Sequence, residues 1–241
     1  MFATNNSWFI NNSGAAPVYD KPDFNSACLT ELVFGESAVI KTKQGEWFYI
    51  QCEDGYKGWV HSFFGSKSSK KNKYDHIIIY PNKEGIFSPT LPFGSRIKEP
   101  EEGSLPINNS LGQESIIKIL NNLLGIPYKW GGKTTLGFDC SGLVQAVLWG
   151  CGLNIPRDSY QQKLFFQNSK IKLNDSEPGD LHFFGKKEKV THVGFSTGGL
   201  GIIHSQGMVK SDSLDKYSKN CNKNLLDMYL STYSIKCKFT Q

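Results

Sequence analysis

The chain has 241 residues, of which 39% are hydrophobic and 20% charged, and its formal net charge is +5. This composition is that of a folded globular protein of one large or two modest domains, and it excludes a disordered or fibrous chain. The densest basic run, "KSSKKNK" at 67–73, alternates with serine and contains no aromatic residue. We interpret it as a solvated linker, so neither nucleic acid nor a membrane is expected as a partner.

The cysteines and the first residues bear on the compartment. The first 20 residues have no basic start and no apolar core of signal-peptide length, and no window approaches the length of a membrane span. The six cysteines are irregularly spaced with no C-x-x-C pair, so neither a disulfide framework nor a zinc ribbon is indicated. We therefore expect reduced thiols and a cytoplasmic location.

Residues 1–66 are predicted to form a small all-β domain. From residue 15 on, short apolar runs are separated by turn residues, and "EWFYIQCEDGYKGWV" predicts a hairpin that turns at "EDG". Trp47 and Tyr49 then share one face of the hairpin. The pattern favours a barrel of about five strands.

Residues 67–112 are predicted to be a connector. Proline occurs at positions 81, 89, 92, 100 and 106, and the segment includes the charged run "KEPEEGS". A short strand is expected at "HIIIY", with a hairpin around "SPTLPFGSRI". Because the segment is long for a structureless loop, we expect it to pack on one or both domains.

Residues 113–241 show helical spacing first and strands afterwards. Helices are predicted at "QESIIKILNNLLG", from near Asp139, and from near Asp158 through "SYQQKLFFQ". The runs "LHFFG", "THVGFST" and "GIIHSQ" then predict an antiparallel meander, and the tail 209–241 is expected to add a strand or a short helix. This order indicates an α+β fold with helices packed on an antiparallel sheet.

A single cysteine stands at the start of the second predicted helix. Apolar side chains follow Cys140 at intervals of 3, 4, 7 and 8 residues, and Cys151 follows it at 11 residues. Cys140 is therefore the first residue of the buried face of that helix, and its side chain is expected to point at the sheet. Asp139 can serve as the helix N-cap. Peptide dipoles at a helix N-terminus favour a thiolate, which makes Cys140 a candidate nucleophile.

Two histidines are predicted to lie opposite this cysteine. His192 in "THVGF" and His204 in "GIIH" are 12 residues apart on neighbouring antiparallel strands, which brings their side chains close on one face. Each of the three residues alone would be read as structural, but together they suit a relay of nucleophile, base and orienting group. A zinc site of Cys140, His192 and His204 is the alternative, although no fourth ligand is apparent.

The motifs "FDCSGLVQAV", "GD", "THVGF" and "IIHS" occur in the order that is typical of the NlpC-type cysteine peptidases, a papain-like bacterial family that this chain resembles over residues 113–208. The hairpin "GEWFYIQCEDGYKGWVH" resembles that of the bacterial SH3-like domain. The resemblance implies Cys140 as nucleophile, His192 as base and His204 as the third member, with no metal or organic cofactor. The family hydrolyses peptidoglycan peptides.

Two further segments narrow the resemblance. "GIPYKWGG" places Tyr128 twelve residues before the nucleophile, where its hydroxyl is expected to hydrogen-bond the sulfur or the developing oxyanion. "IPRDSYQQ" resembles the segment R-D-S/T-x-x-Q. The first segment resembles the substrate-side segment of the whole family. The second resembles a segment of the subgroup with an N-terminal SH3-like domain, the γ-D-glutamyl-L-diamino acid endopeptidases, also called dipeptidyl-peptidase VI. These enzymes release L-Ala-γ-D-Glu and require a free amino-terminal L-alanine.

Recognition of an ammonium group needs carboxylates and hydroxyls at the end of the groove, together with a wall that excludes longer chains. The SH3-like domain is expected to supply that wall. The predicted substrate-binding residues are Asp139, Ser141, Asp158 and Ser159 on the catalytic domain, and Glu31 and Tyr56 on the SH3-like domain.

Each of these residues has a structural alternative. Asp139 can be a plain N-cap, and Asp158 and Ser159 can cap the third helix. Tyr56 can be an ordinary barrel aromatic, and Glu31 a solvent-facing strand residue.

The sequence thus predicts a cysteine peptidase that cleaves the γ-D-glutamyl–diaminopimelate bond of peptides with a free L-alanine during cell-wall recycling. The alternatives are an exported hydrolase of intact peptidoglycan and a catalytically inactive protein that binds wall peptides. Whether diaminopimelate or lysine follows the scissile bond stays open, as does the oligomeric state.

Overall fold

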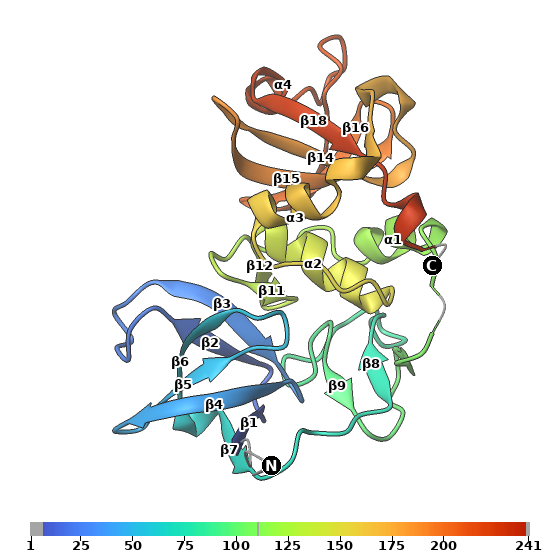
Figure 1. Cartoon of the computed structure of the whole chain (residues 1–241). Helices are drawn as coiled ribbons and strands as arrows, with labels where there is room; N and C mark the ends of the chain where they lie inside the picture. The colour runs from blue at the N-terminus through green and yellow to red at the C-terminus, as the bar shows by residue number, and fades with distance from the viewer. Residues whose placement is uncertain (1–6, 110, 240–241) are drawn as a thin grey trace. The chain divides into compact units, whose positions relative to one another are not determined.

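The computed structural model describes residues 7–109 and 111–239, which form two compact units (Figure 1). The first unit runs to Ile107 and also includes Trp130–Leu136. The second unit comprises Asn108–Lys129 and the chain from Gly137 onward. The fold class is α+β, with an all-β region followed by helices and an antiparallel sheet.

The first unit is built on an antiparallel sheet that has seven strands within the described residues, in the order β3-β2-β6-β5-β4-β1-β7. The predicted barrel of about five strands is thus extended by β1 and β7, which pair with each other. The strands are β1 (Ser7–Asn11), β2 (Ala15–Tyr19), β3 (Cys28–Val33), β4 (Ser37–Gln44), β5 (Trp47–Gln51), β6 (Lys57–His61) and β7 (Gly65–Ser68), with a 3-10 turn η1 (Ser62–Phe64) before β7.

The predicted hairpin of this unit is confirmed. Trp47 pairs with His61 and Tyr49 with Trp59, and the Cys52 amide donates to the Tyr56 carbonyl at 2.8 Å across the turn. In β1, β2, β5 and β6 the buried residues alternate along the strand, as the period of two requires. They form one buried core, which includes Phe9, Ala16, Val18, Leu32, Ala38, Phe48, Ile50 and Val60.

Residues 67–112 carry short strands of their own. β8 (His76–Ile78), β9 (Arg96–Ile97) and β10 (Ser104–Pro106) pair in the order β10-β8-β9. The strand expected at "HIIIY" is therefore present as β8. The hairpin expected around "SPTLPFGSRI" is not formed: residues 88–95 contain no strand, and Arg96–Ile97 pairs with β8 instead. Up to Ile107 this stretch belongs to the first unit.

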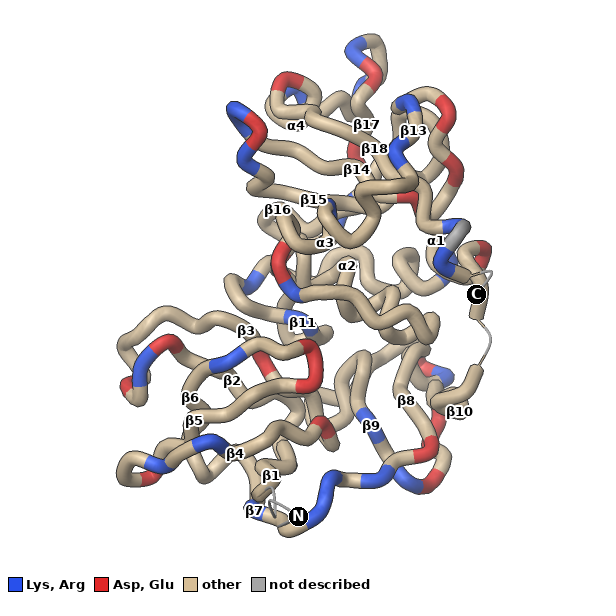
Figure 2. Tube along the Cα trace, viewed as in Figure 1, with Lys and Arg blue, Asp and Glu red and all other residues tan. Residues whose placement is uncertain are grey.

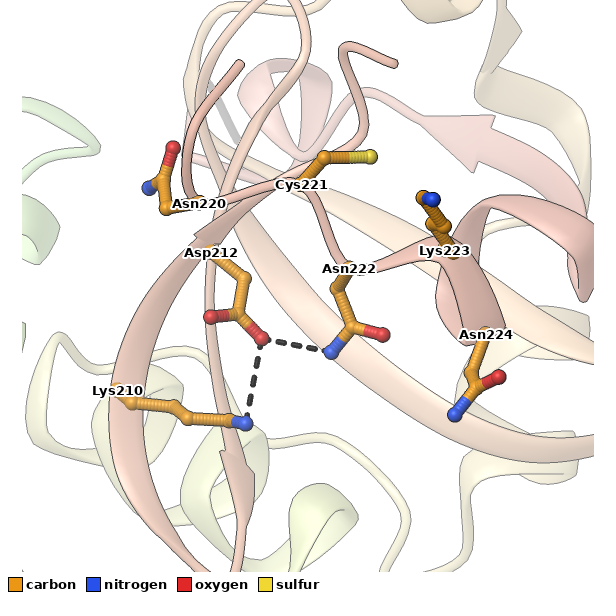
Figure 3. Close-up of a pocket in the computed structure, with 7 residues that line it drawn as sticks. All are labelled: Lys210, Asp212, Asn220, Cys221, Asn222, Lys223 and Asn224. Atoms are coloured by element: carbon orange, nitrogen blue, oxygen red, sulfur yellow. Dashed lines mark hydrogen bonds and ion pairs between the residues drawn. The ribbon is translucent and has the colours of Figure 1, made fainter. Parts of the chain in front are cut away.

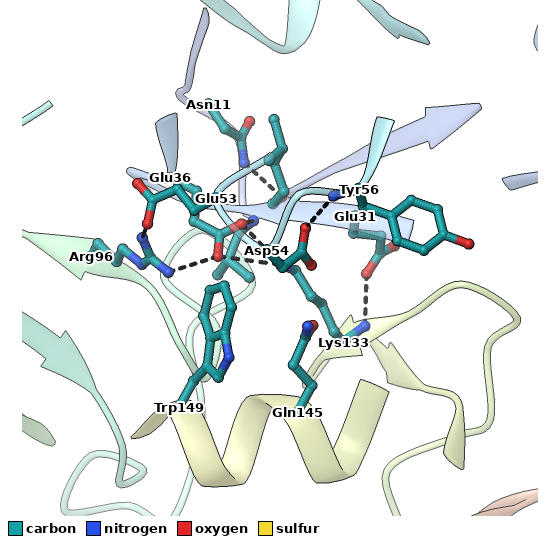
Figure 4. A network of polar contacts seen from close by, with 12 residues as sticks. Asn11, Glu31, Glu36, Glu53, Asp54, Tyr56, Arg96, Lys133, Gln145 and Trp149 are labelled. Carbon is teal, nitrogen blue, oxygen red and sulfur yellow. Dashed lines mark hydrogen bonds and ion pairs between the residues drawn. The ribbon is translucent and has the colours of Figure 1, made fainter. Parts of the chain in front are cut away.

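A buried cluster of charges joins distant parts of the first unit (Figure 4). The Arg96 guanidinium lies 3.0 Å from Glu36 and 2.6 Å from Glu53, and the Lys133 ammonium lies 3.1 Å from Glu36. Arg96, Glu36 and Lys133 are almost fully buried. Each of these charges is therefore stabilised by its ion-pair partners and not by water. The cluster thereby fixes residues 130–136 to the sheet of the first unit.

The second unit contains the predicted meander. The sheet order is β13-β18-β14-β15-β16-β17, and neighbouring strands are antiparallel. Helices α1, α2 and α3 lie together beside this sheet (Figure 1). The strands are β13 (Lys170–Ile171), β14 (Pro178–Lys186), β15 (Lys189–Gly198), β16 (Gly201–Gln206), β17 (Met208–Ser213) and β18 (Tyr229–Tyr233).

The helices of the second unit begin close to the predicted residues. In α2 the side chains of Leu143, Val144, Val147 and Leu148 are fully buried, which matches the expected apolar face. Gly125, at φ 84°, follows the turn after α1. The helices are α1 (Glu114–Asn121), α2 (Cys140–Gly150), α3 (Ser159–Phe165) and α4 (Lys223–Asp227), with 3-10 turns η2 (Gln167–Ser169), η3 (Leu173–Asp175) and η4 (Lys236–Lys238).

The tail contributes β17, α4 and β18 to the second unit, as a strand or short helix was expected there. Two further short strands, β11 (Lys133–Thr134) and β12 (Gly137–Phe138), precede α2. Charged residues of both signs are interspersed along both units, and the longest basic stretch follows β7 (Figure 2). No helix in the described part of the chain is long and apolar enough to cross a membrane.

Candidate active site

Cys140 is the first residue of α2, and its thiol points at the sheet. Asp139 adopts an extended backbone, and its Oδ1 accepts the Gly142 N–H at 2.6 Å, which makes it the N-cap. The backbone N–H groups of Val193 and Ser141 hydrogen-bond the Cys140 sulfur. Because Val193 lies on β15 next to His192, the structure brings the cysteine to the strand where the sequence predicts the base.

The two predicted histidines are in direct contact. Nε2 of His192 lies 2.9 Å from Nδ1 of His204, and the rings are nearly perpendicular at a centroid distance of 5.0 Å. His204 is fully buried, whereas His192 is partly exposed. Since Nε2 of His192 faces His204, its Nδ1 is the nitrogen left to take a proton from a thiol.

A carboxylate that contacts the second of these histidines, Asp212, was not predicted from the sequence. Nε2 of His204 lies 3.0 Å from Oδ2 of Asp212 on β17. His204 and Lys210 stand opposite each other, three residues either side of Gly207, where the β16–β17 hairpin turns with φ 75°. Asp212 is two residues beyond Lys210 and shares its face. Pairing the residues on the two sides of Gly207 would have placed Asp212 near His204 from the sequence alone.

Tyr128 is placed close to the cysteine by backbone bonds. Its N–H donates to the Gly207 carbonyl at 2.8 Å, and it forms a parallel bridge with Phe138. Burial raises the pKa of Tyr128 to about 12, and the charges of Cys140 and Asp139 add to the effect. The phenol therefore keeps its proton at neutral pH, so its hydroxyl can donate a hydrogen bond.

Arg157 holds the N-terminus of α2 in place, and we call it the Arg157 clamp. Arg157, which is 2% exposed, forms a bidentate ion pair with Asp139, with N–O distances of 2.6 and 3.0 Å, and donates to Oγ of Ser141 at 2.9 Å. Gln162 of α3 donates to the Ser141 carbonyl at 3.0 Å. Asp139 and Ser141 are thus engaged within the protein, and direct contact with substrate stays a prediction for both.

Asp158 and Ser159 stand at the start of α3. Asp158 occupies the N-cap position with an extended backbone, but its side chain makes no capping hydrogen bond. Ser159 is the first helical residue. Both lie close in sequence to the Arg157 clamp, and their predicted role in substrate binding stays a prediction.

Glu31 and Tyr56 lie in the first unit. Glu31, on β3, is fully buried, and its Oε2 accepts the Lys133 backbone N–H at 3.2 Å (Figure 4). The alternative of a solvent-facing strand residue is therefore wrong, because Glu31 satisfies a buried backbone donor. Tyr56 packs against the core of its unit, as a barrel aromatic does. A role of either residue in substrate binding stays a prediction.

The relay is electrically neutral at rest. Burial raises the pKa of Cys140 to about 11, with the negative charge of Asp139 adding to the effect. Burial lowers the pKa of His192 to about 3, and electrostatic interactions with His204 and Lys210 act in the same direction. At neutral pH the proton therefore sits on the sulfur, and it moves to the imidazole during the reaction.

Within residues 7–109 and 111–239, no three His, Cys, Asp or Glu side chains are arranged so that they could hold a metal ion.

Comparison with protein families matches residues 125–227 to the NlpC/P60 family and residues 18–62 to the bacterial dipeptidyl-peptidase Sh3 domain. The chain contains an NlpC/P60 domain. It is a cysteine hydrolase, and the peptidase resemblance of its motifs is confirmed.

The curated proteins that this chain matches share one or both of its domains. The gamma-D-glutamyl-L-lysine dipeptidyl-peptidase of Bacillus subtilis (strain 168) is 28% identical over 220 residues, which cover 76% of this chain and 73% of that protein. The probable endopeptidase p60 of Listeria seeligeri is 36% identical over 92 residues, which are 38% of this chain and 17% of that protein. The second match thus concerns one domain of a longer protein.

A solved structure shares the two-domain fold. The crystal structure of an NlpC/P60 family protein from Bacillus cereus ATCC 10987 aligns with a TM-score of 0.74 and 20% identity, over 94% of this chain and 99% of that chain. An NlpC/P60 endopeptidase from Photobacterium damselae subsp. piscicida aligns with a TM-score of 0.62 and 15% identity, over 94% and 70% of the two chains. Both similarities concern the fold alone.

Proposed function

We propose that this protein hydrolyses the bond between γ-D-glutamate and a diamino acid in peptidoglycan-derived peptides that carry a free amino-terminal L-alanine. The observation that supports the reaction type is the 2.9 Å contact between the imidazoles of His192 and His204, together with the backbone hydrogen bond from Val193, the neighbour of His192, to the Cys140 sulfur. The substrate proposal is supported by the relative named gamma-D-glutamyl-L-lysine dipeptidyl-peptidase, whose match extends over most of both chains.

The reaction begins with the movement of one proton. Nδ1 of His192 takes the proton of the Cys140 thiol as the sulfur attacks the γ-glutamyl carbonyl carbon. Because both groups are neutral at rest, the ion pair forms only along the reaction path. The imidazolium of His192 is stabilised by the contact with His204 behind it.

The developing oxyanion needs donors at a fixed place. The backbone N–H of Cys140 is at the N-terminus of α2, where the first amides have no partner within the helix. Tyr128, whose pKa is raised to about 12, offers its hydroxyl as a second donor. His192 then gives its proton to the leaving amine, and water, deprotonated by His192, hydrolyses the thioester.

The diamino acid is proposed to be diaminopimelate, with lysine as the competing candidate. The relatives in Bacillus subtilis and Bacillus cereus are both named for lysine, at 28% and 24% identity. A paired assay of the two peptides decides between them.

For the cellular role, we propose that the protein acts on short peptides in the cytoplasm, in recycling of the cell wall. Five cysteines, Cys28, Cys52, Cys140, Cys151 and Cys221, are free, which suits a reducing compartment. Fractionation of cells with an antibody to the protein tests this location.

The runner-up is a hydrolase of intact wall. It is supported by the match of the catalytic domain to the probable endopeptidases p60 of Listeria. Such an enzyme would not require a free L-alanine. The two candidates therefore differ in their response to a blocked amino terminus.

The test uses four synthetic peptides: L-Ala-γ-D-Glu followed by diaminopimelate or lysine, each with a free or an N-acetylated amino terminus. Products are followed by mass spectrometry, and Cys140→Ala is the control for a contaminating activity. We expect cleavage of the free diaminopimelate peptide, with loss of activity in the Cys140→Ala variant. Equal cleavage of acetylated peptides would favour the hydrolase of intact wall, and no cleavage of any peptide would overturn the proposal.

A further inference from the structure

The row of side chains behind Cys140 ends on a carboxylate. Its members are His192, His204 and Asp212, with contacts of 2.9 Å between the two imidazoles and 3.0 Å between His204 and the carboxylate. We propose that Asp212 is a positioning residue that fixes the tautomers of both histidines, so that Nδ1 of His192 accepts the proton of Cys140. This inference rests on the proposed hydrolytic function.

The carboxylate sets the direction of the row because it can only accept. Burial alone raises the pKa of Asp212, but hydrogen bonds from Asn222 and His204 and electrostatic interactions with His204 and Lys210 bring it below its usual value. Asp212 is therefore ionised at neutral pH and has no proton to donate. Nε2 of His204 must supply the proton of the 3.0 Å contact.

The same reasoning continues to His192. The pKa of His204 is lowered, mainly by burial, so its imidazole is neutral and carries one proton, on Nε2. Its Nδ1 is then an acceptor, and Nε2 of His192 must donate across the 2.9 Å contact. His192 is neutral too, so its Nδ1 keeps a lone pair. That lone pair is what a thiol needs in order to lose its proton.

The Oδ2 of Asp212 that contacts His204 also has two further partners. Nδ2 of Asn222 donates to Oδ2 of Asp212 at 2.7 Å, and the Lys210 ammonium lies 3.3 Å from the same oxygen (Figure 3). Asn222 is the N-cap of α4, where its Oδ1 accepts the Leu225 N–H at 3.2 Å. The orientation of the Asn222 amide is fixed by that cap, and its donor is directed at Asp212.

Asp212 stands between a buried histidine and solvent. Its outer side borders an open polar cavity of about 430 Å³, which Asn220, Cys221, Asn222 and Lys223 also line (Figure 3). Water and the neighbouring ammonium and amide groups solvate the charge on this side. Asp212 therefore stays ionised while it faces His204, which is fully buried.

The test exchanges the acceptor for a group that can donate. In Asp212→Asn the new amide can donate to Nε2 of His204, which reverses the row and places a proton on Nδ1 of His192. We expect kcat on the proposed peptide to fall by a factor on the order of 10³–10⁴, with KM nearly unchanged, by analogy with replacement of a triad aspartate by asparagine. Asp227→Asn is the matched control, because it removes the same charge from an exposed position of α4.

Nitrogen-15 NMR of the imidazoles supplies a readout that a merely structural role would not move. In the unaltered protein both histidines are expected as the Nε2–H tautomer, and in Asp212→Asn as the Nδ1–H tautomer. In Asp212→Ala, formate entering through the open cavity is expected to restore part of the activity. The inference is wrong if the tautomers of Asp212→Asn match those of the unaltered protein, or if its kcat stays within threefold.

The two proposals fail in different ways. If no peptide is cleaved by the unaltered protein, the proposed function falls. The NMR spectra still report the tautomers in that case, because they need no substrate.

Discussion

The Arg157 clamp at the N-terminus of α2 gives the sharpest test of the packing around Cys140. Arg157→Met removes the guanidinium and keeps most of the side-chain volume. It takes from Asp139 the bidentate partner at 2.6 and 3.0 Å, although Asp139 keeps the Gly142 amide at Oδ1. The Asp139 side chain is only 11% exposed, so water compensates little for the loss.

The size of the effect follows from this burial. Removing one partner of a buried ion pair costs about 3–5 kcal/mol, because the other charge is left uncompensated. In a protein of this length each kcal/mol lowers the melting temperature by about 2–4 °C, so we expect a drop of roughly 6–20 °C for the second unit. Adding Asp139→Asn removes the stranded charge and keeps an N-cap side chain, so the double variant should recover part of the loss.

Thermal unfolding followed by calorimetry and circular dichroism measures both variants. Lys163→Met is the control, because Lys163 pairs with the exposed Glu188 at 4.0 Å and such pairs contribute at most about 1 kcal/mol. A melting temperature of Arg157→Met within 2 °C of the unaltered protein would contradict the reasoning. So would a double variant less stable than Arg157→Met, since it would show that the stranded charge is not the cause.

Three further predictions concern Cys140, Tyr128 and Glu36. Because the pKa of Cys140 is raised to about 11, the rate of its alkylation by iodoacetamide should rise continuously from pH 6 to pH 10, and a plateau at neutral pH would show a preformed ion pair. Tyr128→Phe should lower kcat about 10²-fold with little change in KM, and a loss below threefold would exclude an oxyanion donor. Burial raises the pKa of Glu36, but Lys133 and Arg96 lower it more, so it lies below 4.5. The stability that Glu36 contributes is then present above pH 4.5 and lost as the pH falls below it, a dependence that urea unfolding should find absent in Glu36→Gln.

Local spacing was enough to predict the centre of the site. The N-cap at Asp139 and the apolar intervals after Cys140 depend only on helix geometry, and α2 begins at that residue. The 12 residues between His192 and His204 are a hairpin length, and the histidines are in contact. In each case a single element or one hairpin decides the geometry, so the sequence contains all that is needed.

The remainder depends on contacts that no local pattern signals. Glu31 accepts the backbone N–H of Lys133, which is 102 residues further along the chain. Residues 130–136 belong to the first unit although both flanking segments belong to the second. Arg157 was noticed only as part of a motif, and its choice of Asp139 as partner needs the turn between α2 and α3 in three dimensions. Such pairings are set by the packing of distant segments, which sequence spacing does not encode.

The neutral resting state explains why the direction of the histidine row matters here. In an exposed site water lets an imidazole exchange tautomers freely, and a preformed thiolate needs no acceptor at the moment of attack. Around Cys140 burial opposes both charges of the ion pair, so a proton has to cross to His192 as the substrate reacts. This proton transfer requires that Nδ1 of His192 is unprotonated beforehand. A hydrogen-bond acceptor at the far end of the row keeps it unprotonated. Asp212 lies at the edge of the buried region, where solvent keeps its carboxylate charged and therefore an acceptor. His204 donates to it from Nε2 and in turn accepts from Nε2 of His192, which leaves Nδ1 of His192 unprotonated.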